Sequence, residues 1–423
     1  MFASSFRLDL IITVGPQKPG HIKTILSSPL PISVEYKCSF VEITGSALWR
    51  MRAALRHRDR VREIFFEGRG VSFGNFIRAT NYHFPTLESL TLRSPHSHEP
   101  DIPATFLRGP DQPGLRLRRL TLLHASLASV SGLLLSATAL TDLKLDIRSY
   151  TAGFDSSQGS FLLTCLQGMQ CLRSIVLTTP DDLRDFQSQH STPKDIVPLS
   201  KLTRFHYSGS TIFLNNFMSG LSVPSLQDAS FVHCIRFPLL YLSRVIDDVT
   251  EEFRSVSVTF DIENFHIISS THSGKIDYLK PSFRFKVNCF PDSIKSINST
   301  PSKKLAMAEE LALIFSSSNI TQWEHVFSLR EFLRQFHSVR VLRINPFVRE
   351  VGLYLEQEDG DGETTFPVLE EIELSISRLA GHSDKEYQRR AAEALAAFDP
   401  LISARERAGR PVKVYLCEQT PSK

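Results

Sequence analysis

The feature that most constrains this chain is a spacing of leucines that occurs twice in residues 117–147. Residues 117–122 (LRRLTL) and residues 140–145 (LTDLKL) both follow the pattern L-x-x-L-x-L, and an apolar stretch of helical character separates them. Side chains of a strand alternate between two faces, so this spacing places the apolar members on one inner face. Similar units recur, with variations, along the rest of the chain.

The same frame can be placed at eight positions in the first two thirds of the chain. Its first residues are Val61, Leu87, Leu117, Leu140, Leu172, Leu202, Leu226 and Phe253. Successive starts lie between 23 residues (117 to 140) and 32 residues (140 to 172) apart, which leaves room for one helix in each gap. This periodicity is typical of leucine-rich repeats, although it is uneven and slightly long for them. We predict an α/β fold, an irregular leucine-rich-repeat solenoid with a curved parallel sheet on the concave side and helices outside.

We expect one solenoid over residues 1–423. Residues 1–60 form its N-terminal cap and first strands, residues 61–260 the regular repeats and residues 261–338 the irregular repeats. The last repeats and a C-terminal helical cap occupy residues 339–423.

Local patterns predict the elements of the N-terminal cap. Apolar alternation indicates strands at residues 7–14 and 32–36, and helices are expected at residues 21–27 and 46–57.

Residues 261–338 are less regular. Alternation at 283–287 (FRFKV) predicts a strand, the run at 303–315 (KKLAMAEELALIF) predicts a helix, and a further strand is expected near Trp323.

The frame returns at Val339 and Leu369. A long helix is then predicted over residues 384–407, stopped by Gly409 and Pro411 and followed by a last strand at residues 412–416. Such a helix with a charged outer face suits the terminal cap that a solenoid needs.

The frame also predicts which side chains face a binding partner. The leucines point into the core, whereas the third, fifth and seventh positions point to the concave sheet face. The candidate binding residues on that face are Phe65, Arg93, Arg119, Leu123, Asp142, Lys144, Asp146, Val176, Arg204, His206, Asp228 and Val232.

Two interpretations of this face remain open. Parallel strands lie about 4.8 Å apart, so Arg119 should lie beside Asp142, and Arg204 near Asp228. Such neighbours either form a binding surface of mixed charge or satisfy one another and recruit nothing. Apolar residues at these positions would favour binding, because apolar groups on a polar face mark contact sites.

Composition narrows the partners and the compartment. The formal net charge of +3 is too close to balance to indicate a polyanion, and the six cysteines show no C-x-x-C pair. We therefore expect reduced, mostly buried thiols and no nucleic-acid partner.

The apolar stretch at residues 8–14 is short and includes Asp9, so we expect neither a signal peptide nor a membrane contact. The expected protein is a monomer in the cytoplasm or the nucleus.

Four stretches imitate sites of chemistry without meeting their requirements. Residues 15–24 follow a strand, but Pro16 and Pro19 remove N–H groups that would bind phosphate. Residues 359–370 lack the glycine of a calcium loop at its sixth position. The pair at residues 96–98 (HSH) has no third ligand cluster nearby, and the arginines of residues 50–62 are expected to spread over a solvated helix face. We therefore predict no cofactor, no metal and no enzymatic activity.

Taken as a whole, the chain resembles the F-box-like leucine-rich-repeat proteins of mushroom-forming fungi. The likeness runs through most of the chain and is most specific at residues 8–14 (LDLIITV), 19–25 (PGHIKTI), 47–52 (ALWRMR), 133–142 (LLLSATALTD) and 391–411. The resemblance implies a substrate receptor of a cullin-type ubiquitin ligase, in which an F-box binds the ligase adaptor and the repeats hold the target protein.

The sequence departs from this family at its start. Residues 2–10 resemble the junction where the F-box ends, and no F-box helix of the L-P-x-E type precedes them. The adaptor is therefore expected as a partner only if an F-box is encoded upstream. The alternative is a stand-alone interaction or decoy protein that binds a target without any link to ubiquitin transfer.

Overall fold

The structure is a computed structural model. The residues that it describes are 10–13, 29–37, 45–68, 70–93, 102–103, 106–107, 116–147, 157–180, 196–232, 240–260, 264–271, 283–288, 302–315, 332–345, 366–377 and 384–419. The helix expected at residues 21–27, the strand near Trp323 and the imitated sites at 15–24, 96–98 and 359–365 lie outside the described residues.

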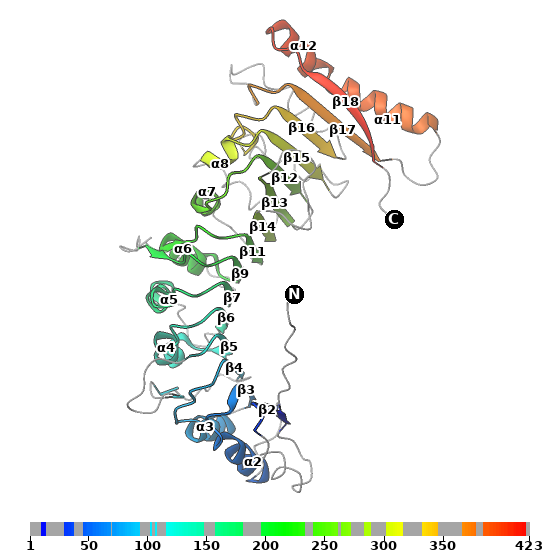
Figure 1. The fold of residues 1–423 in the computed structure, drawn as a ribbon. Helices are drawn as coiled ribbons and strands as arrows, with labels where there is room; N and C mark the ends of the chain where they lie inside the picture. Colours follow the sequence, from blue (N-terminus) through cyan, green and yellow to red (C-terminus); the bar gives the residue numbers. More distant parts are fainter. Residues whose placement is uncertain are drawn as a thin grey trace. The chain divides into compact units, whose positions relative to one another are not determined.

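The chain forms two units, Met1–Val223 and Pro224–Lys423, here called the first and the second unit. In the first unit, parallel strands follow one another in the order of the chain, except that β9 pairs directly with β7 (Figure 1). The strands are β1 (Leu10–Thr13), β2 (Ile32–Lys37), β3 (Val61–Glu67), β4 (Ser89–Arg93), β5 (Arg119–Ala125), β6 (Asp142–Ile147), β7 (Ser174–Thr178) and β9 (Arg204–Ser208). A separate parallel pair joins β8 (Val197–Pro198) to β10 (Leu221–Ser222).

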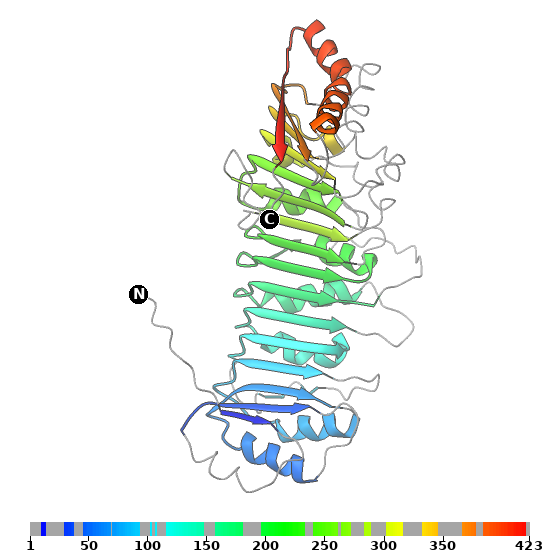
Figure 2. The same ribbon diagram turned by 90° about the vertical axis from the view of Figure 1, so that its right-hand side faces the viewer.

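Helices connect these strands on one side of the sheet. They are α2 (Gly45–Leu55), α3 (Gly70–Ala79), α4 (Leu127–Ser136), α5 (Ser157–Gln167) and α6 (Thr211–Ser219). Figures 1 and 2 show α4, α5 and α6 behind the same face of the sheet, so the opposite face carries no helix of the described residues.

The spaced leucines of the first unit stack in one buried column. Leu90 pairs in register with Leu120, Leu120 with Leu143, and Leu143 with Ile175. The exposed fraction of each of these four side chains is 2% or less. All eight predicted first positions of the frame are likewise buried. The predicted stacking is therefore confirmed, and burial of such columns supplies the main stabilisation of the sheet.

The second unit contains a mixed sheet in the order β11-β14-β13-β12-β15-β16-β17-β18. Its strands are β11 (Asp228–Val232), β12 (Ser255–Phe260), β13 (Asn264–Ser270), β14 (Phe283–Asn288), β15 (Glu310–Phe315), β16 (Val341–Asn345), β17 (Glu371–Ser377) and β18 (Lys413–Gln419). β13 runs antiparallel to both β12 and β14, and the other pairings are parallel. Its helices are α7 (Leu240–Asp248), α8 (Lys303–Ala306), α11 (Asp384–Ala396) and α12 (Asp399–Arg407).

The helix predicted at residues 303–315 is wrong. The structure has the short helix α8 at Lys303–Ala306 and then strand β15, which pairs with β12 and β16. Leu311 and Leu313 are fully buried, as the alternation of a strand requires. A short apolar run is compatible with the period of a helix and with the period of a strand, and pairing with neighbouring strands decides which of the two forms. Ala308 is also buried and stands at the first position of the repeat frame, which its small side chain concealed in the sequence.

The single helix predicted at residues 384–407 is also wrong, because the structure divides it into α11 and α12. The break lies at Phe398, which is fully buried, two residues before Pro400. Proline lacks an N–H group and disfavours a helical conformation of the residue before it, so it begins a helix more readily than it continues one. The predicted strand after Gly409 is confirmed as β18.

We predict that Leu143→Ala lowers the free energy of unfolding by about 2–5 kcal/mol, because it leaves a cavity in the middle of the buried column. Chemical denaturation monitored by circular dichroism measures this change. Leu135→Ala is the matched control: Leu135 is 52% exposed, so its loss should cost less than about 0.5 kcal/mol. Equal effects of the two substitutions would contradict the buried column.

Candidate protein-binding face of the first unit

The sheet face opposite the helices carries three rows of side chains, and the printed registers align them strand by strand. The N-terminal row consists of Ser33, Glu63, Ser89, Arg119, Asp142, Ser174 and Arg204. The central row consists of Glu35, Phe65, Thr91, Thr121, Lys144, Val176 and His206. The C-terminal row consists of Lys37, Glu67, Arg93, Leu123, Asp146, Thr178 and Ser208.

Ten of the twelve candidate residues lie in these rows. The other two, Asp228 and Val232, lie on β11 of the second unit, where both are half-buried. The structure therefore brings all ten predicted residues of the first unit together on one face, each on the side that the frame assigns.

Charges of the N-terminal row pair across an intervening strand. Arg119 lies beside Asp142 in the register, but its Nη2 contacts Glu63 Oε1 at 2.5 Å on the other side. Arg204 Nη2 similarly lies 3.8 Å from Asp142 Oδ1. Each pair reaches over a strand that carries only a serine in this row, Ser89 or Ser174, and that small side chain leaves room for the arginine. The arginines are 52% and 65% exposed, so each pair stabilises the fold by less than about 1 kcal/mol.

The C-terminal row is also paired. Arg93 Nη1 lies 3.6 Å from Glu67 Oε1, and His124 Nδ1 lies 2.9 Å from Asp146 Oδ2. His124 is an extra residue in β5, where the register shifts between Leu123 and Ala125, and its φ of 64° is left-handed. Sequence periodicity could not place His124 on this face, because a bulge interrupts the alternation on which the prediction depends.

The central row begins with Glu35, which forms an ion pair with Lys37, and it also holds apolar side chains and a lysine with no carboxylate partner among the described residues. Phe65 and Val176 are half-buried, and the amine of Lys37 lies 5.0 Å from the centre of the Phe65 ring. Lys144 is exposed between Thr121 and Val176, and no carboxylate of the described residues lies within ion-pair distance of its amine. A partner that docks on this face would meet these groups between two rows of paired charges.

In the second unit, the equivalent strand face is occupied by a tighter network. Arg343 of β16 bonds to Glu310 of β15 at 2.5 Å and to Glu373 of β17 at 2.8 Å. Burial alone would lower the pKa of Arg343, but its hydrogen bonds to the two carboxylates outweigh burial and raise it. Ser255 donates a further hydrogen bond to Glu310, whose exposed fraction is 8%. This network is satisfied internally and leaves no cation for a partner.

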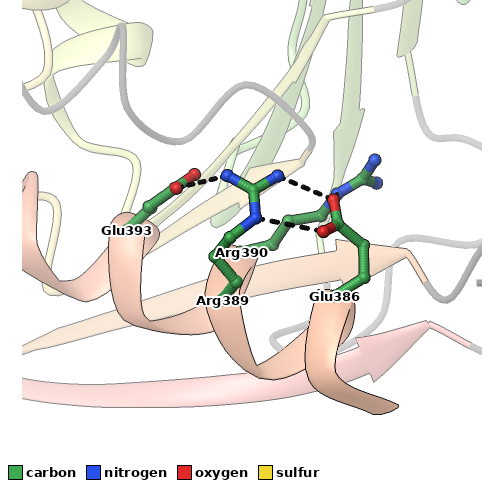
Figure 3. Close-up of polar contacts among 4 residues, drawn as sticks. All are labelled: Glu386, Arg389, Arg390 and Glu393. Carbon is green, nitrogen blue, oxygen red and sulfur yellow. Dashed lines mark hydrogen bonds and ion pairs between the residues drawn. The ribbon is translucent and has the colours of Figure 1, made fainter. Parts of the chain in front are cut away.

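The helix α11 carries a second charged cluster, which Figure 3 shows in detail. Arg389 bonds to Glu386 at 2.7 Å and to Glu393 at 2.5 Å, and Arg390 bonds to Glu386 at 3.1 Å. The hydrogen bond from Arg389 lowers the pKa of Glu386 to about 2. Spacings of three and four residues on an exposed helix are the usual arrangement of such pairs, so the cluster is a solvated outer face.

The described residues hold no metal-binding cluster, and their three free cysteines differ in exposure: Cys165 is buried, Cys417 is half-buried and Cys171 is exposed, so the expected burial of most thiols holds for one of the three. The described residues include no group of three or more histidine, cysteine, aspartate or glutamate side chains placed to hold a metal ion. Burial raises the pKa of Cys165 to about 11, so its thiol stays protonated and unreactive near neutral pH. None of the helices in the described ranges has the length and hydropathy needed to cross a membrane.

Comparison with known protein families finds no family model that matches this chain. Comparison with curated proteins finds no sequence that matches it. Functional interpretation therefore starts from the geometry of the sheet face.

We predict that Arg343→Ala lowers the free energy of unfolding by about 3 kcal/mol, because it leaves two partly buried carboxylates without their cation. Arg340→Ala is the matched control, since Arg340 forms a similar two-bond pair with Glu370 but both side chains are exposed. Its loss should cost much less than the loss of Arg343, because water screens an exposed pair. Urea denaturation compares the two variants, and a smaller effect at Arg343 than at Arg340 would contradict the account.

We predict that the Glu386 carboxyl stays ionised down to about pH 3. Its folded-state pKa lies below the ordinary value of 4.5, so the stabilisation from its ion pairs is present above about pH 4.5 and is lost as the pH falls toward 2. Side-chain carboxyl NMR shifts recorded between pH 6 and pH 3 should show no titration of Glu386 in the wild type. In Arg389→Gln the titration should move up toward pH 4.5; the same titration in the wild type would refute the pairing.

Proposed function

We propose that the chain is a leucine-rich-repeat protein whose sheet face in the first unit binds another protein without catalysing a reaction. Several observations support this proposal. The repeat frame coincides with parallel strands, its apolar members form a buried column, and helices cover the other side of the sheet. Proteins of this class bind partners on the extended sheet face that stacking of repeats creates.

The central row carries the proposal. In the two neighbouring rows the arginines pair with carboxylates, whereas Lys144 has no carboxylate partner among the described residues and Val176 lies directly beside it in register. A cation next to apolar groups is a composition that favours contact with a protein over contact with water alone. The partner that fits best offers a carboxylate opposite Lys144 and an apolar side chain opposite Val176 or Phe65.

Within this function, we propose that the bound protein is a target of ubiquitin transfer. The support is the resemblance of residues 8–14, 47–52, 133–142 and 391–411 to fungal F-box-like repeat proteins. Co-purification of the full-length gene product with a cullin-ligase adaptor tests this step. Retention of a target without the adaptor favours the alternative, a stand-alone interaction or decoy protein. Both alternatives place the protein in the cytoplasm or the nucleus.

We predict that Lys144→Glu weakens binding of the captured target by at least about tenfold, or 1.4 kcal/mol. The substitution replaces the cation of the central row by a carboxylate, which repels the carboxylate of the partner. Affinity capture from native lysate identifies the target, and titration with that purified target measures the effect. Lys201→Glu is the matched control, since Lys201 is an exposed lysine of the same unit that lies outside the three rows. Equal binding by the wild type and Lys144→Glu, with thermal stability unchanged, would overturn the proposed face.

A further inference from the structure

The arginines of residues 50–62 are a feature that the proposed function does not use. Residues 45–62 contain six arginines, no lysine and one carboxylate. The sequence predicts that these arginines spread over a solvated helix face, but the structure divides them into two sets. Three belong to the fold: Arg50 is buried, Arg60 donates to a backbone carbonyl at 2.8 Å, and Arg62 pairs with a glutamate at 3.3 Å. The other three are exposed.

Two of the exposed arginines share a face of α2 with a tryptophan. Arg52 and Arg56 follow Trp49 by three and seven residues, and Arg56 N donates to Arg52 O at 3.1 Å, so helical geometry continues through Arg56. The opposite face of the helix packs into the unit through Met51 and Leu55, which are both buried. Trp49 therefore points outward, and its exposed fraction is 56%.

The third exposed arginine adds a second aromatic ring to this surface. Arg58 follows the C-terminal end of α2, and its guanidinium carbon lies 4.7 Å from the centre of the Tyr82 ring. Tyr82 follows the C-terminal end of α3 and is 52% exposed. We call Trp49, Arg52, Arg56, Arg58 and Tyr82 the arginine patch. Among the described residues, no carboxylate lies within ion-pair distance of its three guanidinium groups.

The composition of the arginine patch indicates what kind of partner fits it. Three exposed cations that pair with no carboxylate of the described residues attract an anionic group. Arginine binds carboxylates through two parallel hydrogen bonds, which lysine cannot form, and residues 45–62 contain no lysine. Tryptophan, tyrosine and arginine are also the residues that contribute most to the binding free energy of protein interfaces. The patch therefore fits a protein segment that carries carboxylates.

Two other anionic partners fit the patch less well. A single-stranded nucleic acid stacks successive bases on several aromatic rings, whereas Arg58 already lies on Tyr82 and leaves Trp49 as the other ring of the patch. A membrane surface takes up a broad apolar helix face, whereas the outward residues that follow Trp49 on α2 are arginines and the half-buried Ala53.

We propose that the arginine patch binds an acidic segment of another protein. Two carboxylates of this segment pair with Arg52 and Arg56, which lie about 6 Å apart along the helix axis because each residue advances an α-helix by about 1.5 Å. An apolar side chain of the segment covers Trp49, and a third carboxylate meets Arg58 on the Tyr82 ring. The patch lies on a helix and its following turn, so the proposal does not depend on the sheet face that carries the central row.

A synthetic peptide tests the proposal on the full-length chain. The peptide has about 15 residues, and its leucine is followed three and seven residues later by glutamates, the spacing of Trp49, Arg52 and Arg56 on α2. The chain has two tryptophans, so Trp49 is the only one left in Trp323→Phe. Its emission should shift to shorter wavelength when the peptide covers it, and the anisotropy of labelled peptide at about 0.15 M salt gives the affinity.

The double substitution Arg52→Gln/Arg56→Gln should weaken peptide binding by at least about tenfold. Arg118→Gln/Arg173→Gln is the matched control, because it removes the same charge from two exposed arginines of the first unit that lie outside the patch. This control should bind the peptide as the wild type does. Arg52→Glu/Arg56→Glu should instead bind a peptide in which lysines replace the glutamates, an exchange that a loss of folding could not produce.

A wild type that does not bind the glutamate peptide, or reversed charges that do not restore binding, would overturn the proposal. Tighter binding to a single-stranded RNA of about 12 nucleotides, or to vesicles that contain phosphatidylserine, would also overturn it and would identify the other class of partner. Lys144→Glu should leave peptide binding unchanged, so failure of this proposal is distinguishable from failure of the proposed function.

Discussion

The structure of each unit depends on the burial of apolar side chains that alternate along parallel strands and align from one strand to the next. In the first unit this alignment gives the column through Leu90, Leu120, Leu143 and Ile175. Each strand alone could not cover its apolar face, so every repeat depends on its neighbours. The same alternation determines the opposite face, because the residues between the leucines must then point away from the helices.

Because side chains alternate along each strand, the two faces of the sheet differ in composition. One face stabilises the sheet, and the other collects charged and small side chains whose spacing is set by the strand register. On that second face, arginines reach over serines to carboxylates two strands away, whereas Lys144, beside Val176, has no carboxylate partner among the described residues. In the second unit, Arg343 lies between two glutamates, and its positive charge is paired with their carboxylates. Similar residue types therefore leave an exposed lysine without a carboxylate partner among the described residues of the first unit and pair the arginine of the second unit completely.

Much of this arrangement could be predicted from spacing alone. The eight starts of the frame, the buried column and the outward positions follow from a period of two and a repeat of one strand and one helix. Three features could not be predicted from the spacing. The run at 303–315 is compatible with the period of a helix and with the period of a strand, and its pairing with β12 and β16 makes it a strand from Glu310 onward. β13 pairs antiparallel, which the frame does not encode. His124 reaches the face through a bulge, and a bulge leaves no periodic signal.

The most direct test of this account is the accessibility of consecutive residues of β6. Single cysteine substitutions from Asp142→Cys to Ile147→Cys, each treated with a thiol reagent under native conditions and resolved by mass spectrometry, report the exposure of each position. The account predicts labelling with a period of two: fast at positions 142, 144 and 146, and slow at 143, 145 and 147. Labelling with a helical period, or equal labelling at all six positions, would contradict the stacked strands on which both the fold and the proposed binding face depend.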